Sequence, residues 1–197
     1  MVKNLYIIAG CNGAGKTTAS FTILPEILHC NEFVNADEIA RGLSPFQPEK
    51  VAIEAGRIML NRINELLIEN ETFAFETTLA TKSYRNTITK AKAKGYTVTL
   101  LYFWLSNTEL AKQRVQTRVL EGGHDIEPNV IERRYYAGIK NLFEIYFSAA
   151  DEVFIFDNSK GKHILMAEKK INMPIEVIEN TIFNQLIESY EINCKAK

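Results

Sequence analysis

The stretch from residue 5 to residue 20 constrains the fold of this chain more than any other. Residues 5–9 form an apolar run typical of a buried parallel strand, and residues 10–17 read GCNGAGKT. These letters match the pattern G-x-x-x-x-G-K-[ST], in which a glycine-rich loop joins a strand to a helix and binds phosphate. We therefore predict a phosphate-binding P-loop here, in preference to a glycine-rich turn that binds nothing.

The residue types of this loop suit a nucleotide. Glycines let the backbone turn tightly so that successive N–H groups point at an anion, and the start of the next helix adds its positive dipole end. Lys16 is expected to reach the β- and γ-phosphates, and the Thr17 hydroxyl is expected to bind Mg²⁺. Cys11 is expected to fill space rather than react. The predicted nucleotide-binding residues of the loop are Gly10, Asn12, Gly13, Ala14, Gly15, Lys16, Thr17 and Thr18.

Length and charge limit the classes of protein and partner. The chain has 197 residues, which suits one domain over residues 1–197. Its 23 Lys and Arg against 24 Asp and Glu give a formal charge of −1, which argues against nucleic acid or a membrane as the partner. The three cysteines show no metal-binding spacing, and their odd number argues against a disulfide framework. We expect a cytoplasmic protein without a secretion signal or membrane span.

Strand and helix patterns alternate along most of the chain. This alternation predicts an α/β fold with three layers, in which helices cover both faces of a mainly parallel sheet of five strands, or six. The strands are expected at residues 5–9, 32–35, 73–76, 98–105 and 153–156, with 164–167 as the sixth. Helices are expected at residues 16–28, from 36, at 48–70, at 82–94, from 128 and from 174. A further helix is expected to start with a capping box at Ser106 and Glu109 and to run to about residue 121.

Three acidic residues lie at the ends of predicted strands or just after them, where α/β folds bind ligands. Asp37 is expected to accept a proton from an attacking hydroxyl; the alternative is that it only caps the helix that it begins. Glu76 would bind substrate hydroxyls or Mg²⁺, unless it and the following threonines cap the next helix. Asp157 also ends an apolar run and is the rival to Glu76 as the metal-binding acid.

Two pairs of arginines flank a glycine-rich connector at residues 122–125. Arg114 and Arg118 share a helix face, and Arg133 and Arg134 follow the connector. This arrangement predicts a lid over about residues 112–135 that closes on the transferred phosphoryl group, although solvated helix surface is the commoner environment of arginine. Helical phase does not decide which arginine contacts phosphate. His124 is expected to be a surface or loop-fixing residue.

Taken together, the motifs resemble those of zeta-toxin-like P-loop kinases. The resemblance covers residues 4–160, and within that family this chain is similar to the compact chromosomal type. It is carried by GCNGAGKTT at 10–18, VNADEIA at 34–40, FETTL at 75–79, GGHDI at 122–126, RRY at 133–135 and FDNS at 156–159.

The resemblance implies an ATP-dependent, Mg²⁺-dependent phosphotransferase with the strand order of nucleoside monophosphate kinases. The implied acceptor is a UDP-N-acetylamino sugar, as for a UDP-N-acetylglucosamine kinase, and an antitoxin protein is an implied partner. By the same resemblance Asp37 is the general base, Lys16 and Thr17 contact phosphate and Mg²⁺, and Arg118 and Arg134 bind phosphate. The implied substrate-side residues are Glu76, Thr77 and Arg133, and Asn158 is placed near the nucleotide base.

Our leading hypothesis is a kinase that transfers the γ-phosphate of ATP to a hydroxyl of a small molecule. One alternative is a switch that hydrolyses ATP in order to bind a partner. Another is a kinase acting on nucleosides or on polynucleotide ends, for which the balanced charge provides no support. A GTPase is disfavoured because the guanine-reading pattern [NT]-K-x-D is absent from the sequence.

Overall fold

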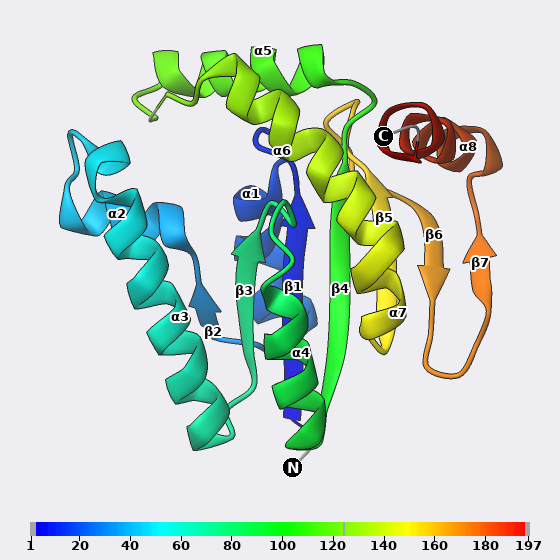
Figure 1. Cartoon of the computed structure of the whole chain (residues 1–197), viewed down its shortest axis with the longest axis horizontal. Helices are drawn as coiled ribbons and strands as arrows, with labels where there is room; N and C mark the ends of the chain where they lie inside the picture. Colours follow the sequence, from blue (N-terminus) through cyan, green and yellow to red (C-terminus); the bar gives the residue numbers. More distant parts are fainter. Residues whose placement is uncertain (1–2, 124, 196–197) are drawn as a thin grey trace.

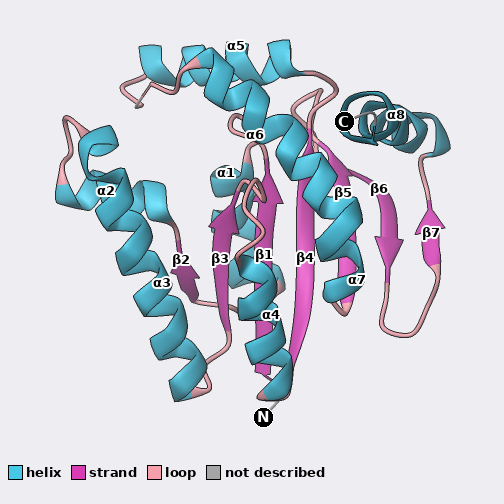
Figure 2. Cartoon of the chain, in the orientation of Figure 1, coloured by secondary structure: helices cyan, strands magenta, loops and turns pink. Residues whose placement is uncertain are grey.

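The computed structural model describes residues 3–123 and 125–195. Within them, the chain forms one seven-stranded sheet in the order β2-β3-β1-β4-β5-β6-β7 (Figures 1 and 2). The first five strands in this order are parallel, and β6 and β7 are antiparallel additions at one edge. The strands are β1 (Lys3–Gly10), β2 (Glu32–Val34), β3 (Phe73–Thr77), β4 (Tyr96–Trp104), β5 (Glu152–Asp157), β6 (Ile164–Lys169) and β7 (Ile175–Val177).

Helices cover both faces of the sheet, which confirms the predicted α/β class. In Figure 1, α3, α4 and α6 lie in front of the sheet and α1 lies behind it. The α-helices are α1 (Lys16–Thr22), α2 (Ala36–Leu43), α3 (Ala52–Glu69), α4 (Tyr84–Ala93), α5 (Thr108–Leu120), α6 (Pro128–Asn141), α7 (Phe147–Ala149) and α8 (Asn180–Tyr190). The shorter helical turns are η1 (Ile23–Ile27), η2 (Pro48–Val51), η3 (Leu142–Tyr146) and η4 (Glu191–Lys195).

The hydrophobic core follows the central strands β1 and β4. Every residue of β1 from Leu5 to Gly10 is buried, as is most of β4, because helices pack on both faces of these strands. Among the largest fully buried side chains are Phe73, Phe75, Tyr102, Phe103, Trp104 and Tyr146. The core therefore fixes the strand ends from which the candidate site residues project.

The sheet has more strands than the five or six that we predicted. Residues 175–177, which we assigned to a helix beginning at Pro174, instead form strand β7, and the helix begins at Asn180. The prediction was wrong because β6 offers a hydrogen-bonding edge to this segment, and such tertiary pairing overrides a local helix signal.

Two local details of the helices also differ from the sequence patterns. Asn107, rather than Ser106, caps α5, since its Oδ1 accepts the Leu110 N–H at 2.8 Å. The predicted helix at residues 16–28 changes at Ile23 from α1 to the π-helical turn η1, which contains Pro25.

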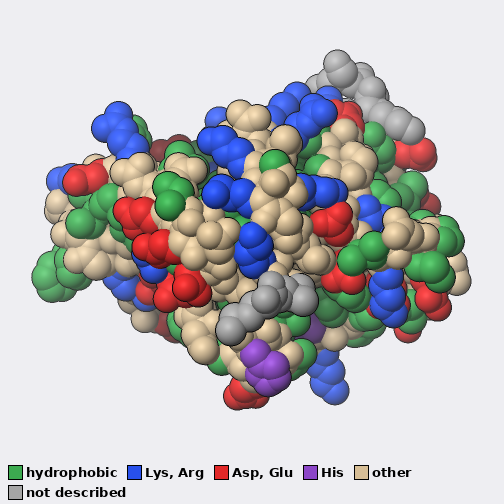
Figure 3. Space-filling model, turned by 90° about the horizontal axis from the view of Figure 1, so that it is seen from below, with side chains coloured by type: hydrophobic (Ala, Val, Ile, Leu, Met, Phe, Trp, Pro, Cys, Tyr) green, Lys and Arg blue, Asp and Glu red, His purple; other side chains and the backbone are tan. Residues whose placement is uncertain are grey.

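The face opposite the P-loop carries mixed charge. Viewed from below, onto the amino ends of the parallel strands, lysine and arginine side chains lie among acidic and apolar ones (Figure 3). Within the described part of the chain, no helix combines the length and the apolar character needed to cross a bilayer.

Candidate active site

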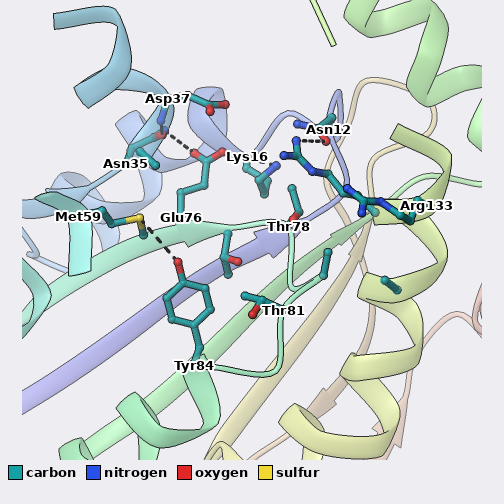
Figure 4. Close-up of a pocket in the computed structure, with 15 residues that line it drawn as sticks. Asn12, Lys16, Asn35, Asp37, Met59, Glu76, Thr78, Thr81, Tyr84 and Arg133 are labelled. Carbon is teal, nitrogen blue, oxygen red and sulfur yellow. Dashed lines mark hydrogen bonds and ion pairs between the residues drawn. The ribbon is translucent and has the colours of Figure 1, made fainter. Parts of the chain in front are cut away.

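A cavity of about 440 Å³ opens at the carboxyl ends of β1, β2 and β3 (Figure 4). These strands are neighbours in the sheet, so residues distant in the sequence meet at one edge. Its walls come from the P-loop, from the starts of α2 and α4, and from α3 and α6. The lining residues are Asn12, Lys16, Asn35, Ala36, Asp37, Met59, Glu76, Thr77, Thr78, Ala80, Thr81, Tyr84, Arg133, Arg134 and Ala137.

The P-loop conformation requires its glycines. Gly10 has φ of 143°, and a Cβ atom there would lie 2.2 Å from the carbonyl oxygen of Phe103 on β4. Gly13 and Gly15 have φ of 78° and 79°, in the left-handed region that disfavours larger residues. Gly15 is also the N-cap of α1, so the loop delivers the chain directly into a helix N-terminus.

Lys16 is held across this loop. Its Nζ donates to the carbonyl oxygen of Cys11 at 3.0 Å and lies 3.5 Å from Glu76 Oε1. The lysine is only 6% exposed, so its charge is directed into the cavity rather than toward bulk water. Burial raises the pKa of the Cys11 thiol to about 11, in agreement with the expected space-filling role.

Glu76 joins the P-loop to the neighbouring strand ends. Its Oε2 accepts hydrogen bonds from Thr17 Oγ1 at 2.8 Å and from Asn35 Nδ2 at 3.0 Å. A hydroxyl beside a carboxylate is a donor set that suits Mg²⁺, and the residues present therefore fit the ion. The capping alternative for Glu76 and the threonines after it is not seen, because α4 begins only at Tyr84, with Ser83 as its N-cap; Thr77 Oγ1 instead accepts the N–H of Leu79.

Asp157 has different contacts. Its carboxylate accepts hydrogen bonds from the backbone N–H and the hydroxyl of Ser159 and is buried. Of the two acids considered for metal binding, Glu76 contacts Thr17 of the P-loop, whereas Asp157 stabilises the turn after β5 through its contacts with Ser159.

Asp37 lies in the first turn of α2, and it lines the cavity. The N-cap of α2 is Asn35, whose Oδ1 accepts the Asp37 N–H at 2.8 Å. The capping alternative for Asp37 is therefore wrong. Its carboxylate is exposed and lies on one side of Lys16 and Glu76, opposite Arg133 (Figure 4).

The arginines separate into two groups. Arg133 and Arg134 line the cavity, and Arg134 Nη1 donates to Asn12 Oδ1 at 3.3 Å. Burial lowers the pKa of Arg134, while the Asp37 carboxylate acts in the opposite direction. Arg114 and Arg118 belong to α5, and neither is among the described residues that line the cavity.

Arg114 and Asn158 support the P-loop from the end of β5. Arg114 Nη2 donates to the carbonyl oxygens of Asn158 and Ser159 at 2.8 and 3.0 Å. Asn158 Nδ2 donates to the carbonyl oxygen of Ala14 at 2.8 Å, and a Cβ on Gly15 would lie 2.5 Å from this nitrogen. The structure thus places Asn158 against the P-loop, and its predicted position near the nucleotide base stays a prediction.

The remaining predicted residues have less distinctive surroundings. Thr17 is half-buried and Thr18 is exposed in the first turn of α1, while His124 lies outside the described residues. Sequence reasoning missed Met59, Tyr84 and Ala137, which line the cavity from three separate helices. For Met59 a signal was present in the helix predicted at residues 48–70, whose apolar residues must pack on the sheet: Met59 is buried, whereas the neighbouring Ile58 is exposed.

An acidic side chain that faces a P-loop lysine across an open cavity allows a phosphoryl group to pass to a second molecule. This arrangement is that of a P-loop kinase, and the chain is a phosphotransferase of this class. The model of the Zeta toxin family matches residues 2–170, so the chain belongs to that family. The membership confirms the resemblance found in the motifs.

Relatives extend this comparison. An uncharacterized protein of Haemophilus influenzae is 29% identical over 135 residues, which are 68% of this chain and 94% of that protein. The structure of AvrRxo1-ORF1:-ORF2 with ATP has a TM-score of 0.74 and 16% identity, over 94% of this chain and 63% of that chain. The PezAT chromosomal toxin-antitoxin system of Streptococcus pneumoniae has a TM-score of 0.64 and 16% identity, over 96% of this chain and 86% of that chain.

At these identities the two solved structures are similar to this chain in fold. The chain also spans less than two thirds of the AvrRxo1 chain.

Proposed function

We propose that the enzyme transfers the γ-phosphoryl group of ATP to a hydroxyl group of a small molecule. The observation that carries this proposal is the placement of Asp37 beside Lys16 and Glu76 in one cavity. The likeness in fold to a structure that contains ATP supports ATP as the donor.

Different residues of the cavity have different roles in the proposed reaction. Asp37 accepts the proton of the acceptor hydroxyl, whose oxygen forms a bond to the γ-phosphorus as the bond from that phosphorus to the β,γ-bridging oxygen breaks. Lys16 and Arg134 neutralise negative charge on the transferred group and on the departing ADP. Thr17 and Glu76 would hold Mg²⁺, which supplies further neutralisation of the phosphates when bound.

The segment at residues 112–135 is proposed as a lid. It ends at Arg133 and Arg134, so a movement of this segment would carry both guanidinium groups relative to the P-loop. Arg114 of α5 donates a hydrogen bond to the loop after β5. In this proposal the part of α5 near Arg114 therefore stays in place, and the residues after it move. The predicted contact of Arg118 with phosphate depends on such a movement and stays a prediction.

The proposal is tested with γ-labelled ATP and a mixture of nucleotide sugars, nucleosides and sugars, including UDP-N-acetylglucosamine. Label should appear on a compound of the mixture. Asp37→Ala should reduce transfer by about 10²–10⁴-fold, with the dissociation constant for ATP changed by less than about twofold. The matched control is Glu38→Ala, on the next residue, which is also exposed; this variant should keep full transfer.

Two results would contradict the proposal in different ways. Full transfer by Asp37→Ala would remove this residue as the base. Release of labelled inorganic phosphate without any labelled acceptor would favour the alternative of an ATP-hydrolysing binding switch. Salt-sensitive binding to oligonucleotides would instead favour a polynucleotide kinase.

An antitoxin partner is also proposed, because the PezAT structure of similar fold is that of a toxin-antitoxin system. Co-purification of a protein encoded next to this chain, and relief of growth arrest by that protein, would test this part.

A further inference from the structure

We infer that the hydroxyl of Tyr84 is a specificity-determining donor, which gives its hydrogen bond to an oxygen atom of the phosphate acceptor. This inference rests on the proposed kinase function and deepens it. It combines three observations: the weak partner of this hydroxyl within the protein, the fixed placement of the tyrosine ring, and the position of the hydroxyl in the cavity.

The partner of the Tyr84 hydroxyl within the protein is weak. Among the described residues, this hydroxyl donates only to the thioether sulfur of Met59, at 3.7 Å. Both side chains line the cavity, so a ligand there can reach them. Thioether sulfur is a poor hydrogen-bond acceptor, and an oxygen atom of a ligand would be a better one. The hydroxyl can therefore exchange the contact with Met59 for one with a bound molecule.

Three other tyrosine hydroxyls have much stronger partners. Each of them donates to a backbone carbonyl oxygen of a distant segment: Tyr96 at 2.8 Å, Tyr135 at 2.7 Å and Tyr146 at 2.6 Å. These bonds connect separate parts of the fold, as is usual for the hydroxyl of a buried tyrosine. Within the described part of the chain, the Tyr84 hydroxyl donates to no carbonyl oxygen. Its hydroxyl is therefore not needed to hold the fold together.

The ring of Tyr84 has a fixed position. It packs on Phe75, a fully buried residue of β3, with the two ring centroids 4.7 Å apart and the planes at 31°. Tyr84 is also the first residue of α4, so the helix fixes its backbone. Burial raises the pKa of Tyr84, and the hydroxyl therefore stays protonated at neutral pH. A donor held in this way can distinguish ligands by the position of an oxygen atom.

The hydroxyl lies on the acceptor side of the cavity. Phe75 directly precedes Glu76 on β3, so packing on Phe75 brings the tyrosine close to this acid. In Figure 4, Asp37 and Tyr84 lie on opposite sides of Glu76, and the Tyr84 hydroxyl is directed from α4 toward Met59. An acceptor whose reacting hydroxyl contacts Asp37 would therefore extend past Glu76 and present a second oxygen atom to Tyr84.

The first experiment measures the effect of the hydroxyl on transfer to the compound that the unmodified enzyme labels in the mixture of nucleotide sugars, nucleosides and sugars. Tyr84→Phe should lower kcat/KM for this acceptor by about three- to tenfold, the usual effect of one neutral hydrogen bond, and should change the KM for ATP by less than about twofold. Tyr96→Phe removes a hydroxyl at the opposite end of the sheet; it should lower the resistance to denaturant and leave the acceptor kcat/KM unchanged. An unchanged acceptor kcat/KM in Tyr84→Phe, or an equal change in the KM for ATP, would overturn the inference.

Met59→Leu separates the proposed role from a structural one. This substitution keeps an apolar side chain of similar size and removes the sulfur. If the contact between Tyr84 and Met59 only supported the cavity wall, both variants should lose acceptor kcat/KM to the same extent, which would overturn the inference. The proposed role predicts a smaller loss in Met59→Leu, because its Tyr84 hydroxyl can still bind the acceptor.

The second experiment locates the oxygen atom. Analogues of the acceptor, each with one oxygen replaced by hydrogen, are compared in the unmodified enzyme and in Tyr84→Phe. One analogue should lose about three- to tenfold in kcat/KM with the unmodified enzyme and nothing further with Tyr84→Phe, because both changes remove the same hydrogen bond. Independent losses for every analogue would overturn the inference and leave the kinase function intact. Release of phosphate from ATP without any labelled acceptor would overturn the kinase function, and this inference with it.

Discussion

The phosphate-binding side and the acceptor side of the cavity are built differently. The P-loop lies between a buried strand and a helix, and its conformation depends on glycines that fit against the β4 backbone and against Asn158. The acceptor side is formed by individual side chains of α2, α3, α4 and α6, and Asp37 and Arg133 on it are exposed. The comparison teaches that phosphate binding depends on backbone and packing, whereas acceptor choice depends on side chains that can change without altering the fold.

The largest effect is expected at Lys16, where the two sides meet. Lys16→Ala removes the buried cation that faces the cavity, so kcat/KM should fall by about 10³-fold or more. The measurement is steady-state transfer from labelled ATP, with circular dichroism to verify folding. Lys50→Ala, an exposed lysine of η2, is the control. Retention of about a tenth of the activity in Lys16→Ala would contradict a central role of the P-loop.

Glu76 tests whether the phosphate side holds a metal ion. Glu76→Gln keeps the shape of the side chain and removes its charge, so the Mg²⁺ concentration for half-maximal transfer should rise by about tenfold or more. Glu71→Gln, at an exposed glutamate before β3, should leave the Mg²⁺ requirement unchanged. An equal requirement in Glu76→Gln and the unmodified enzyme would show that another group binds the ion.

Asn141 tests the acceptor side through the loop at residues 77–81. The buried Asn141 Nδ2 donates to the carbonyl oxygen of Leu79 at 2.8 Å, and Leu79 has φ of 58°, an unfavourable conformation for leucine. Asn141→Ala leaves this carbonyl without its partner, so the free energy of unfolding should fall by about 1–3 kcal/mol. The KM for the acceptor should rise more than the KM for ATP.

The control for this variant is Asn86→Ala, at an exposed position of α4, measured by denaturant unfolding and by the same kinetics. Equal changes in both KM values would mean that Asn141 stabilises the whole protein without positioning the acceptor loop.

The smallest effect concerns two buried thiols, Cys11 in the P-loop and Cys30 just before β2. Burial raises the pKa of Cys11 and of Cys30 to about 11, so at pH 8 both thiols stay protonated in the folded protein. In a Cys194→Ser background, a thiol reagent should react slowly before unfolding and should titrate both thiols afterwards. Rapid reaction of Cys11 in the folded protein would show that the P-loop region opens readily, whereas rapid reaction of Cys30 would show opening near the start of β2.

The same shift has a consequence for stability. In the unfolded chain both thiols lose their protons near pH 9, whereas in the folded protein they keep them until about pH 11. The free energy by which the buried neutral thiols stabilise the fold is therefore fully present below pH 9. It decreases as the pH rises toward 11.

The sequence predicted the phosphate side well because its signals are local. A contiguous motif specified the P-loop, and Glu76 was a candidate because it lies at the end of a strand in a parallel sheet, as was Asp37 of the acceptor side, just after its strand. The acceptor side was harder. Helical phase alone did not show that Arg114 supports the P-loop while Arg133 and Arg134 line the cavity.

Other differences also arise from contacts between distant segments. Met59 and Tyr84 share the cavity through packing of α3 and α4, which no sequence spacing records. Strand β7 forms because β6 provides a pairing edge, although Pro174 and the residues after it suggested a helix. Contacts between segments distant in the sequence thus determine both the cavity lining and strand β7, which local sequence patterns did not predict.

The most direct test of the central claim is a crystal structure of the protein with Mg²⁺ and a non-hydrolysable ATP analogue. We expect the γ-phosphate to lie against the P-loop amides and Lys16 Nζ, with the Asp37 carboxylate turned toward the face from which an acceptor hydroxyl would attack. A γ-phosphate bound away from Lys16, or an Asp37 side chain directed out of the cavity with the nucleotide in place, would contradict it.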